Sequence, residues 1–141
     1  MDILGGKIDF VLHSIGMSVN VRKGNHYTEQ NYDYTHKGWD VSAVSFHKVM
    51  QVLYKKDAMN EWGSIVALSY MAAQRVFPDY NDMADNKAYL ESIARSFGYF
   101  FGKGRTRPSY PANNRIGGQK GTRDDRRSAL HYFGCVGHQR D

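Results

Sequence analysis

The fold is decided by two short apolar runs, Ile8-Asp9-Phe10-Val11-Leu12-His13-Ser14 and Ser64-Ile65-Val66-Ala67-Leu68-Ser69. Each run has the length of a strand and ends on polar residues. Nearly continuous apolar runs are typical of parallel sheets with helices on both sides, so we expect the first strand to be covered on both faces.

Each apolar run is followed by a loop and then by a helical pattern. Residues 20–34 are polar, have no apolar period and are predicted to form a long loop. Apolar residues recur at helical spacing over residues 35–59 and again over 79–100, where Pro78 is well placed near a helix start. This alternation predicts an α/β domain with a parallel sheet, whose ligands bind beyond the carboxyl ends of the strands.

Charge divides the chain into two parts. Residues 1–102 hold 10 Lys/Arg and 11 Asp/Glu, a net charge of −1, whereas residues 103–141 hold 9 and 3, a net charge of +6. The second part has no sustained apolar period, and its apolar cluster at 130–133 is too small for a core. We therefore predict a basic tail over 103–141 that is loop-like or disordered. Its aromatic residues are too scattered for a stacking platform, so we expect a solvated tail that does not bind nucleic acid.

The only cysteine, Cys135, excludes an internal disulfide and indicates a reducing compartment. His138 lies three residues further on, but without a second pair of ligands we expect no metal site. No apolar run approaches the roughly 20 residues that a membrane-spanning helix needs. We therefore expect a cytoplasmic protein without a membrane partner.

Tyr80 and Lys87 are the strongest candidates for chemistry. Seven positions correspond to two helical turns, so we expect both side chains on one face of the second helix. A nearby ammonium would favour the phenolate and lower the pKa of Tyr80. Tyr70, at the end of the second strand, would converge on the same pocket. The alternative is coincidence, because the chain has ten tyrosines and several lysines.

Residues 1–102 resemble the bacterial NADH-dependent enoyl-acyl-carrier-protein reductases, a divergent branch of the short-chain dehydrogenase/reductase superfamily. Three segments carry the resemblance: His13-Ser14-Ile15-Gly16, Ser69-Tyr70, and Pro78-Asp79-Tyr80-Asn81-Asp82-Met83 leading to Lys87. Tyrosines ten residues apart, with a lysine seven beyond the second, are this family's arrangement, whereas ordinary members place the lysine four residues after the tyrosine. The resemblance implies a partial Rossmann-like, doubly wound parallel sheet with long crossover helices.

The resemblance also implies the reaction and the roles of individual residues. NADH would reduce the double bond of an enoyl thioester on acyl carrier protein, in fatty-acid elongation. Tyr80 would donate a hydrogen bond to the enolate oxygen, Lys87 would bind the nicotinamide ribose, and the two long helices would pair subunits into a homo-oligomer. The implied catalytic residues are Tyr70, Tyr80 and Lys87, the cofactor-binding residues Ser14, Ile15, Gly16 and Lys87, and the substrate-binding residues Ser18, Tyr70 and Met83.

Two parts of the family's pattern are not found in this sequence: the glycine-rich turn that binds pyrophosphate, and the strand, loop and substrate-binding helix that follow the second long helix. Residues 1–102 therefore match the central part of such an enzyme, and we expect the isolated chain not to bind NADH. One hypothesis is a truncated reading of a reductase gene that leaves the frame near residue 102. The alternatives to an active reductase are an inactive fragment or subunit-interaction module, and a reductase of the same superfamily with another substrate.

Overall fold

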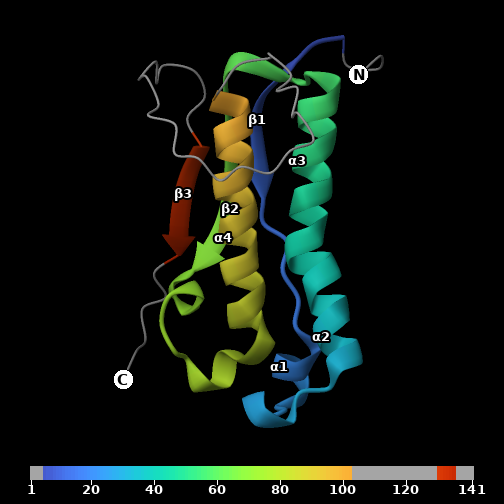
Figure 1. Cartoon of the computed structure of the whole chain (residues 1–141), viewed down its shortest axis with the longest axis vertical. Helices are drawn as coiled ribbons and strands as arrows, with labels where there is room; N and C mark the ends of the chain where they lie inside the picture. The colour runs from blue at the N-terminus through green and yellow to red at the C-terminus, as the bar shows by residue number, and fades with distance from the viewer. Residues whose placement is uncertain (1–4, 103–129, 136–141) are drawn as a thin grey trace, which may run out of the picture.

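A computed structural model describes residues 5–102 and 130–135 of the chain. Its strands form one parallel sheet in the order β1-β2-β3: β1 (Ile8–His13), β2 (Met59–Tyr70) and β3 (Leu130–Cys135). The α-helices are α1 (Val19–Lys23), α2 (Tyr32–Trp39), α3 (Ser45–Lys56) and α4 (Asn81–Gly102). In Figure 1 the strands run downward and the long helices α3 and α4 run back upward.

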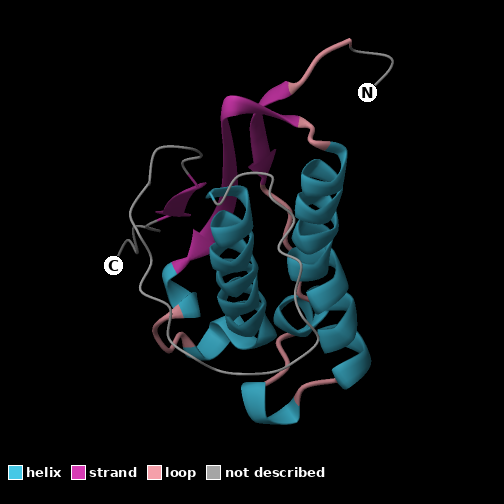
Figure 2. Cartoon of the chain, turned by 45° about the horizontal axis from the view of Figure 1, so that its top comes forward, coloured by secondary structure: helices cyan, strands magenta, loops and turns pink. Residues whose placement is uncertain are grey.

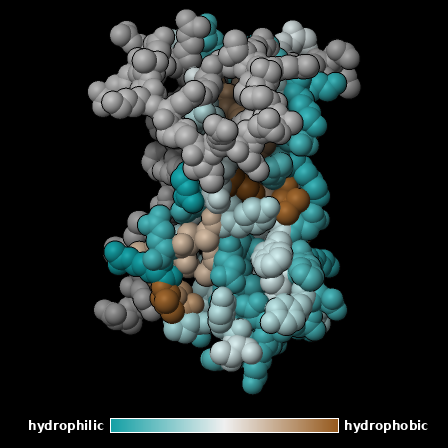
Figure 3. All heavy atoms as spheres, viewed as in Figure 1, coloured by the Kyte–Doolittle hydropathy of each residue, from teal (hydrophilic) through white to brown (hydrophobic). Residues whose placement is uncertain are grey.

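The α/β class with parallel strands and long crossover helices is confirmed. Figure 2 shows α3 and α4 together on one side of the sheet. Between them and the strands lies the core cluster, made of Ala43, Phe46, Met50, Leu53, Ala58, Met59, Ile65, Ala67, Leu90, Ile93 and Ala94. On the solvent side, the helices present a mainly hydrophilic surface in Figure 3.

The expectation that β1 is covered on both faces is wrong for the part of the chain that the structure describes. Side chains alternate between the two faces of a strand. Val11 is half-buried and His13 buried, whereas Phe10 and Leu12 are 58% and 53% exposed. The described helices lie on one face of the sheet only. An apolar run in the sequence is therefore compatible with a strand covered on one face as well as with a strand covered on both.

The first predicted helix is confirmed with shifted ends. It begins at α2, where the Asn31 side chain accepts hydrogen bonds from the backbone N–H groups of Asp33 and Tyr34 at 3.0 and 3.2 Å. A π-helical segment, η2 (Asp40–Val44), connects α2 to α3. The helix ends at Asp57, which adopts the left-handed conformation with φ of 49°.

The predicted long loop over 20–34 is wrong in part, because α1, a short 3-10 helix (Tyr27–Glu29) and the start of α2 occupy much of it. Short helices of this kind are formed by capping rather than by an apolar period. Ser18 caps the start of α1, and Gly24 ends it with φ of 66°.

Residues 130–135 are another correction to the sequence prediction. They form β3, paired with β2 from Ile65↔Leu130 to Tyr70↔Cys135, where a loop-like tail was expected. The edge of β2 supplies the hydrogen bonds that a short strand needs, which its own composition does not indicate. The rest of the predicted tail, with His138, lies outside the described residues. No helix in the described part is long and apolar enough to cross a membrane.

Candidate active site

The candidate site lies where β1 and β2 end. After β1, residues 14–18 lead into α1. After β2, the chain passes through two 3-10 helices, Met71–Ala73 and Pro78–Tyr80, before α4 begins. The end of β2 lies beside the second and third turns of α4, since Leu68 accepts a hydrogen bond from Lys87 and Ser69 donates one to Glu91. This is the edge of the sheet at which the sequence pattern predicted ligand binding.

Tyr70 and Tyr80 are brought together as predicted. Their ring centroids lie 4.7 Å apart with an interplanar angle of 42°, and Tyr70 also contacts Phe77 at 5.3 Å. Burial, and secondarily the neighbouring Tyr70, raises the pKa of Tyr80 above its ordinary value. The expected lowering by Lys87 is therefore wrong, and the Tyr80 phenol remains protonated at neutral pH.

The helical-face argument for Tyr80 and Lys87 is also wrong. Tyr80 lies in a 3-10 helix, and Asn81 separates it from the regular part of α4 with φ of 44° and ψ of −141°. The Asn81 side chain stabilises this turn, since its amide donates to the Asn25 carbonyl at 2.5 Å and its oxygen accepts from the Asp82 N–H at 2.6 Å. The turn at Asn81 thus sets how the phenol is placed relative to α4.

Lys87 is 7% exposed, and its Nζ donates a hydrogen bond to the Leu68 carbonyl at 2.7 Å. Burial lowers the pKa of Lys87. The backbone of Gly16 passes close by: a Cβ on Gly16 would lie 3.6 Å from Lys87 Nζ and 2.6 Å from Met83 Cε. A side chain at this position would therefore displace the end of the Met83 side chain and lie beside the ammonium.

The segment before Gly16 is open to solvent. Ser14 and Ile15 are exposed, with Ile15 at 51%, so the predicted cofactor-contacting residues are accessible to a ligand. The segment is fixed behind Gly16 by Ser42, whose hydroxyl accepts from Met17 N–H at 2.9 Å and donates to Met17 carbonyl at 3.0 Å. Ser42 lies in the π-helical segment, a type of helix that occurs frequently at functional sites. Sequence reasoning missed it, because nothing in the apolar pattern marks a π-helical turn.

Ser18, predicted to bind substrate, is buried and has two partners within the chain. Its hydroxyl donates to the Asp82 carboxylate and accepts from the backbone N–H of Val21 at 3.0 Å. Met83 lies in the same region, with its sulfur 3.9 Å from both the Ser42 hydroxyl and the Asn86 amide. Asp82 was not predicted as a site residue.

The hydrogen bonds around His13 assign its tautomer. Ser45 donates its single hydroxyl proton to the Val41 carbonyl at 2.6 Å, so it accepts at 2.9 Å from His13 Nε2. Nδ1 of the neutral ring is then an acceptor, and no hydrogen-bond partner for it lies within the described residues. Burial, followed by the charge of Lys87, lowers the pKa of His13 below 6.5.

We expect His13 to make the chain less stable in acid. Because its pKa is lower in the folded than in the unfolded state, its contribution is fully present above the unfolded value of 6.5 and is lost as the pH falls through the folded pKa. The melting temperature of the His13→Gln variant should therefore fall less than that of the wild type between about pH 7 and about pH 5. Thermal unfolding followed by circular dichroism measures both, with the exposed His26→Gln as control. Parallel curves for wild type and His13→Gln would contradict the expectation.

Comparisons with known proteins bear on the same residues. The family model described as "Enoyl-(Acyl carrier protein) reductase" matches residues 2–108. Enoyl-[acyl-carrier-protein] reductase [NADH] 1 of Rhizobium meliloti is 38% identical over 90 residues, which cover 64% of this chain and 32% of that protein. Enoyl-[acyl-carrier-protein] reductase [NADH] FabI of Rickettsia bellii is 33% identical over 90 residues, covering 64% of this chain and 34% of that protein.

Solved structures also match the chain. The crystal structure of FabI from Alistipes finegoldii matches with a TM-score of 0.70 and 66% identity, covering 74% of this chain and 39% of that one. A FabI–NADH complex from the same organism also matches, with a TM-score of 0.70, 66% identity, and coverage of 74% and 37%. The chain thus spans about a third of the length of the relatives that it matches.

Proposed function

The chain belongs to the enoyl-(acyl carrier protein) reductase family, and from this premise we propose that its described residues form the reducing site of an NADH-dependent enoyl thioester reductase. Two observations at the strand ends carry the proposal: the Tyr70 and Tyr80 rings pack together, and the Lys87 ammonium lies against the Gly16 backbone and the Leu68 carbonyl. The names of the relatives, which include NADH, and the FabI–NADH complex support the choice of cofactor.

The residues present fit a nicotinamide cofactor. Gly16 places bare backbone beside the Lys87 ammonium, since a Cβ there would lie 3.6 Å from Nζ. An ammonium has three donors, and the Leu68 carbonyl takes one of them, which leaves N–H groups for ribose hydroxyls. The exposed backbone of Ser14, Ile15 and Gly16 would border the ring. When bound, NADH supplies the hydride.

Tyr80 would act on the thioester oxygen of the substrate. Its raised pKa keeps the phenol protonated, so it can donate a hydrogen bond to this oxygen as negative charge develops there. Tyr70 packs against the Tyr80 ring and fixes its orientation. Lys87 would add positive charge to the site, and Met83 would lie toward the acyl chain.

The wider setting is proposed from the same family. The substrate would be an enoyl group on acyl carrier protein, handled in the cytoplasm. The two long helical segments, α2–α3 and α4, would pair copies of the chain; their outer faces expose Val52 at 57% and Tyr89 at 45%. The alternative function is a catalytically inactive fragment or interaction module.

Two proteins test the proposal: the chain itself, and a chimera in which residues 8–102 replace the matching segment of the Alistipes finegoldii FabI. NADH fluorescence measures binding, and the loss of NADH absorbance on adding an enoyl thioester measures turnover. We expect the chimera to oxidise NADH only when the thioester is present. A folded chimera that binds NADH without turnover would contradict the proposed site. Turnover by the chimera without NADH binding by the chain alone would favour the inactive fragment for the chain as it stands.

A further inference from the structure

Asp82 is a fully buried carboxylate that the proposed chemistry does not use. It is 0% exposed and lies in the first turn of α4. Its Oδ1 accepts from the Ser18 hydroxyl, and its Oδ2 accepts from the Asn20 amide at 3.2 Å. The positive end of the α4 dipole also stabilises a negative charge at this position. Since a buried charge is costly, its partners indicate a specific role.

The partners of Asp82 tie together three parts of the chain. Ser18 belongs to the segment after β1, and Asn20 belongs to α1 and donates onward to Thr35 of α2 at 3.0 Å. The α2 backbone closes over the carboxylate, since a Cβ on Gly38 would lie 3.4 Å from Asp82 Oδ2. Asp82 is therefore the point at which α1, α2 and α4 meet.

Ser18 links Asp82 to the segment that borders the proposed site. Its one proton goes to Asp82 and its oxygen caps α1 through Val21, so both functions of the hydroxyl serve the fold. Two residues earlier, Gly16 passes against Met83 and Lys87, which lie on α4 with Asp82. Fixing Ser18 to Asp82 thus fixes the distance between the Gly16 backbone and α4.

We infer that Asp82 is a positioning residue, which through Ser18 holds the segment 14–18 against Met83 and Lys87. The inference deepens the proposed function, because that segment and Lys87 are the residues proposed to border the cofactor. It assigns Ser18 to the same positioning task in place of direct contact with substrate.

Two variants of the full chain separate this role from the capping of α1. Ser18→Ala removes both the cap and the link, whereas Asp82→Asn leaves the cap and removes the charge. We expect amide hydrogen exchange at Ile15, Gly16 and Met17 to become about tenfold faster in both, as for the loss of one hydrogen bond to a charged group. Amides of α3 and of the middle of α4 should keep their wild-type rates. Unchanged rates at 15–17, or the same acceleration throughout the chain, would overturn the inference.

The pKa of Lys87, measured by NMR of its ε-carbon, is a second readout. A purely structural role for Asp82 would not change this pKa in the expected direction. Removing a negative charge by itself lowers the pKa of a lysine, whereas release of segment 14–18 admits water to the ammonium and raises it. We expect a rise in Asp82→Asn and in Ser18→Ala. Asp85→Asn, which removes a charge one turn along the same helix, is the matched control and should give no rise. A fall in Asp82→Asn would overturn the inference.

Neither readout uses NADH or a thioester. A chimera without turnover would therefore disprove the proposed function and leave the anchoring by Asp82 standing. Unchanged exchange and titration in an active chimera would disprove the anchoring alone.

Discussion

Replacement of Tyr80 by Phe in the chimeric reductase is expected to lower turnover of an enoyl thioester by about 10²- to 10³-fold, the usual effect of removing one donor to a developing oxyanion. The variant keeps the ring, and with it the 4.7 Å contact with Tyr70, and loses only the hydroxyl. NADH affinity should therefore change by less than about twofold, well under the effect of one lost hydrogen bond to a bound ligand. Steady-state kinetics gives the turnover, and a fluorescence titration gives the NADH affinity.

The matched control for this result is Tyr32→Phe, which removes a hydroxyl from a side chain that is 73% exposed. It should leave both turnover and NADH affinity at the level of the unmodified chimera. An equal loss of turnover and NADH binding in Tyr80→Phe would contradict the division of roles, because it would place the phenol in cofactor binding. Full activity would exclude Tyr80 as the donor.

The general fold could be predicted because its determinants are local. The runs at Ile8–His13 and within Met59–Tyr70 are apolar over a strand's length, and the helical segments between them have a recognisable period. Parallel strands with helical crossovers then place His13 and Tyr70 at one edge of the sheet. The meeting of Tyr70 with Tyr80 follows from this topology.

The details of the site could not be predicted, because they depend on contacts between distant segments. The turn at Asn81, with its positive φ, moves Tyr80 off the helix, and no periodicity indicates such a turn. Ser42 contacts Met17, and Asp82 contacts Ser18, only after α2 and α4 have packed together. A buried polar residue in a helical pattern has the same appearance in the sequence as an exposed one.

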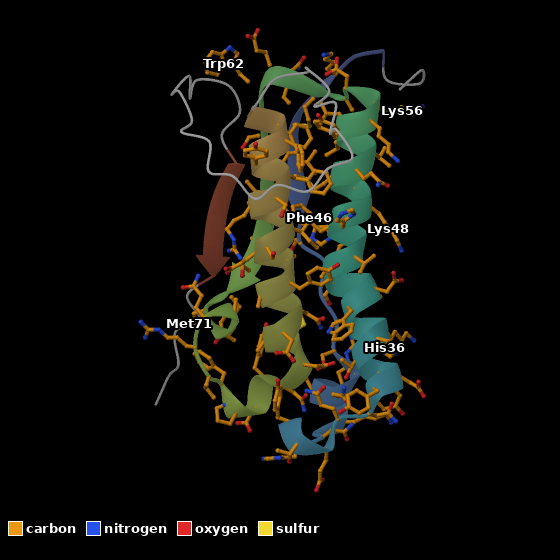
Figure 4. All side chains as sticks on the ribbon, viewed as in Figure 1. His36, Phe46, Lys48, Lys56, Trp62 and Met71 are labelled. Atoms are coloured by element: carbon orange, nitrogen blue, oxygen red, sulfur yellow. The ribbon has the colours of Figure 1, made fainter. Side chains whose placement is uncertain are left out.

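Truncation of Phe46 to alanine is expected to lower the free energy of unfolding of the chain by about 3–5 kcal/mol. Phe46 is 0% exposed, and Figure 4 shows it on the side of α3 that faces α4, away from Lys48. Its ring packs against that of His13 with centroids 5.0 Å apart, so it joins the helix layer to the end of β1. Domains of this size are stable by only about 5–15 kcal/mol, so the variant should be largely destabilised. Urea denaturation followed by circular dichroism measures the loss.

Phe10→Ala also removes a phenylalanine ring, but from the face of β1 that points away from the helices, where Phe10 is 58% exposed. If that face meets water, the cost should stay below about 1 kcal/mol, because little apolar surface is returned to solvent. A cost equal to that of Phe46→Ala would mean that the second face of the sheet is covered in solution. The packing among the described residues would then be only part of the packing around β1, and the prediction that both faces of this strand are covered would be correct. A comparison of the two losses in free energy of unfolding thus shows on which face of β1 the core lies.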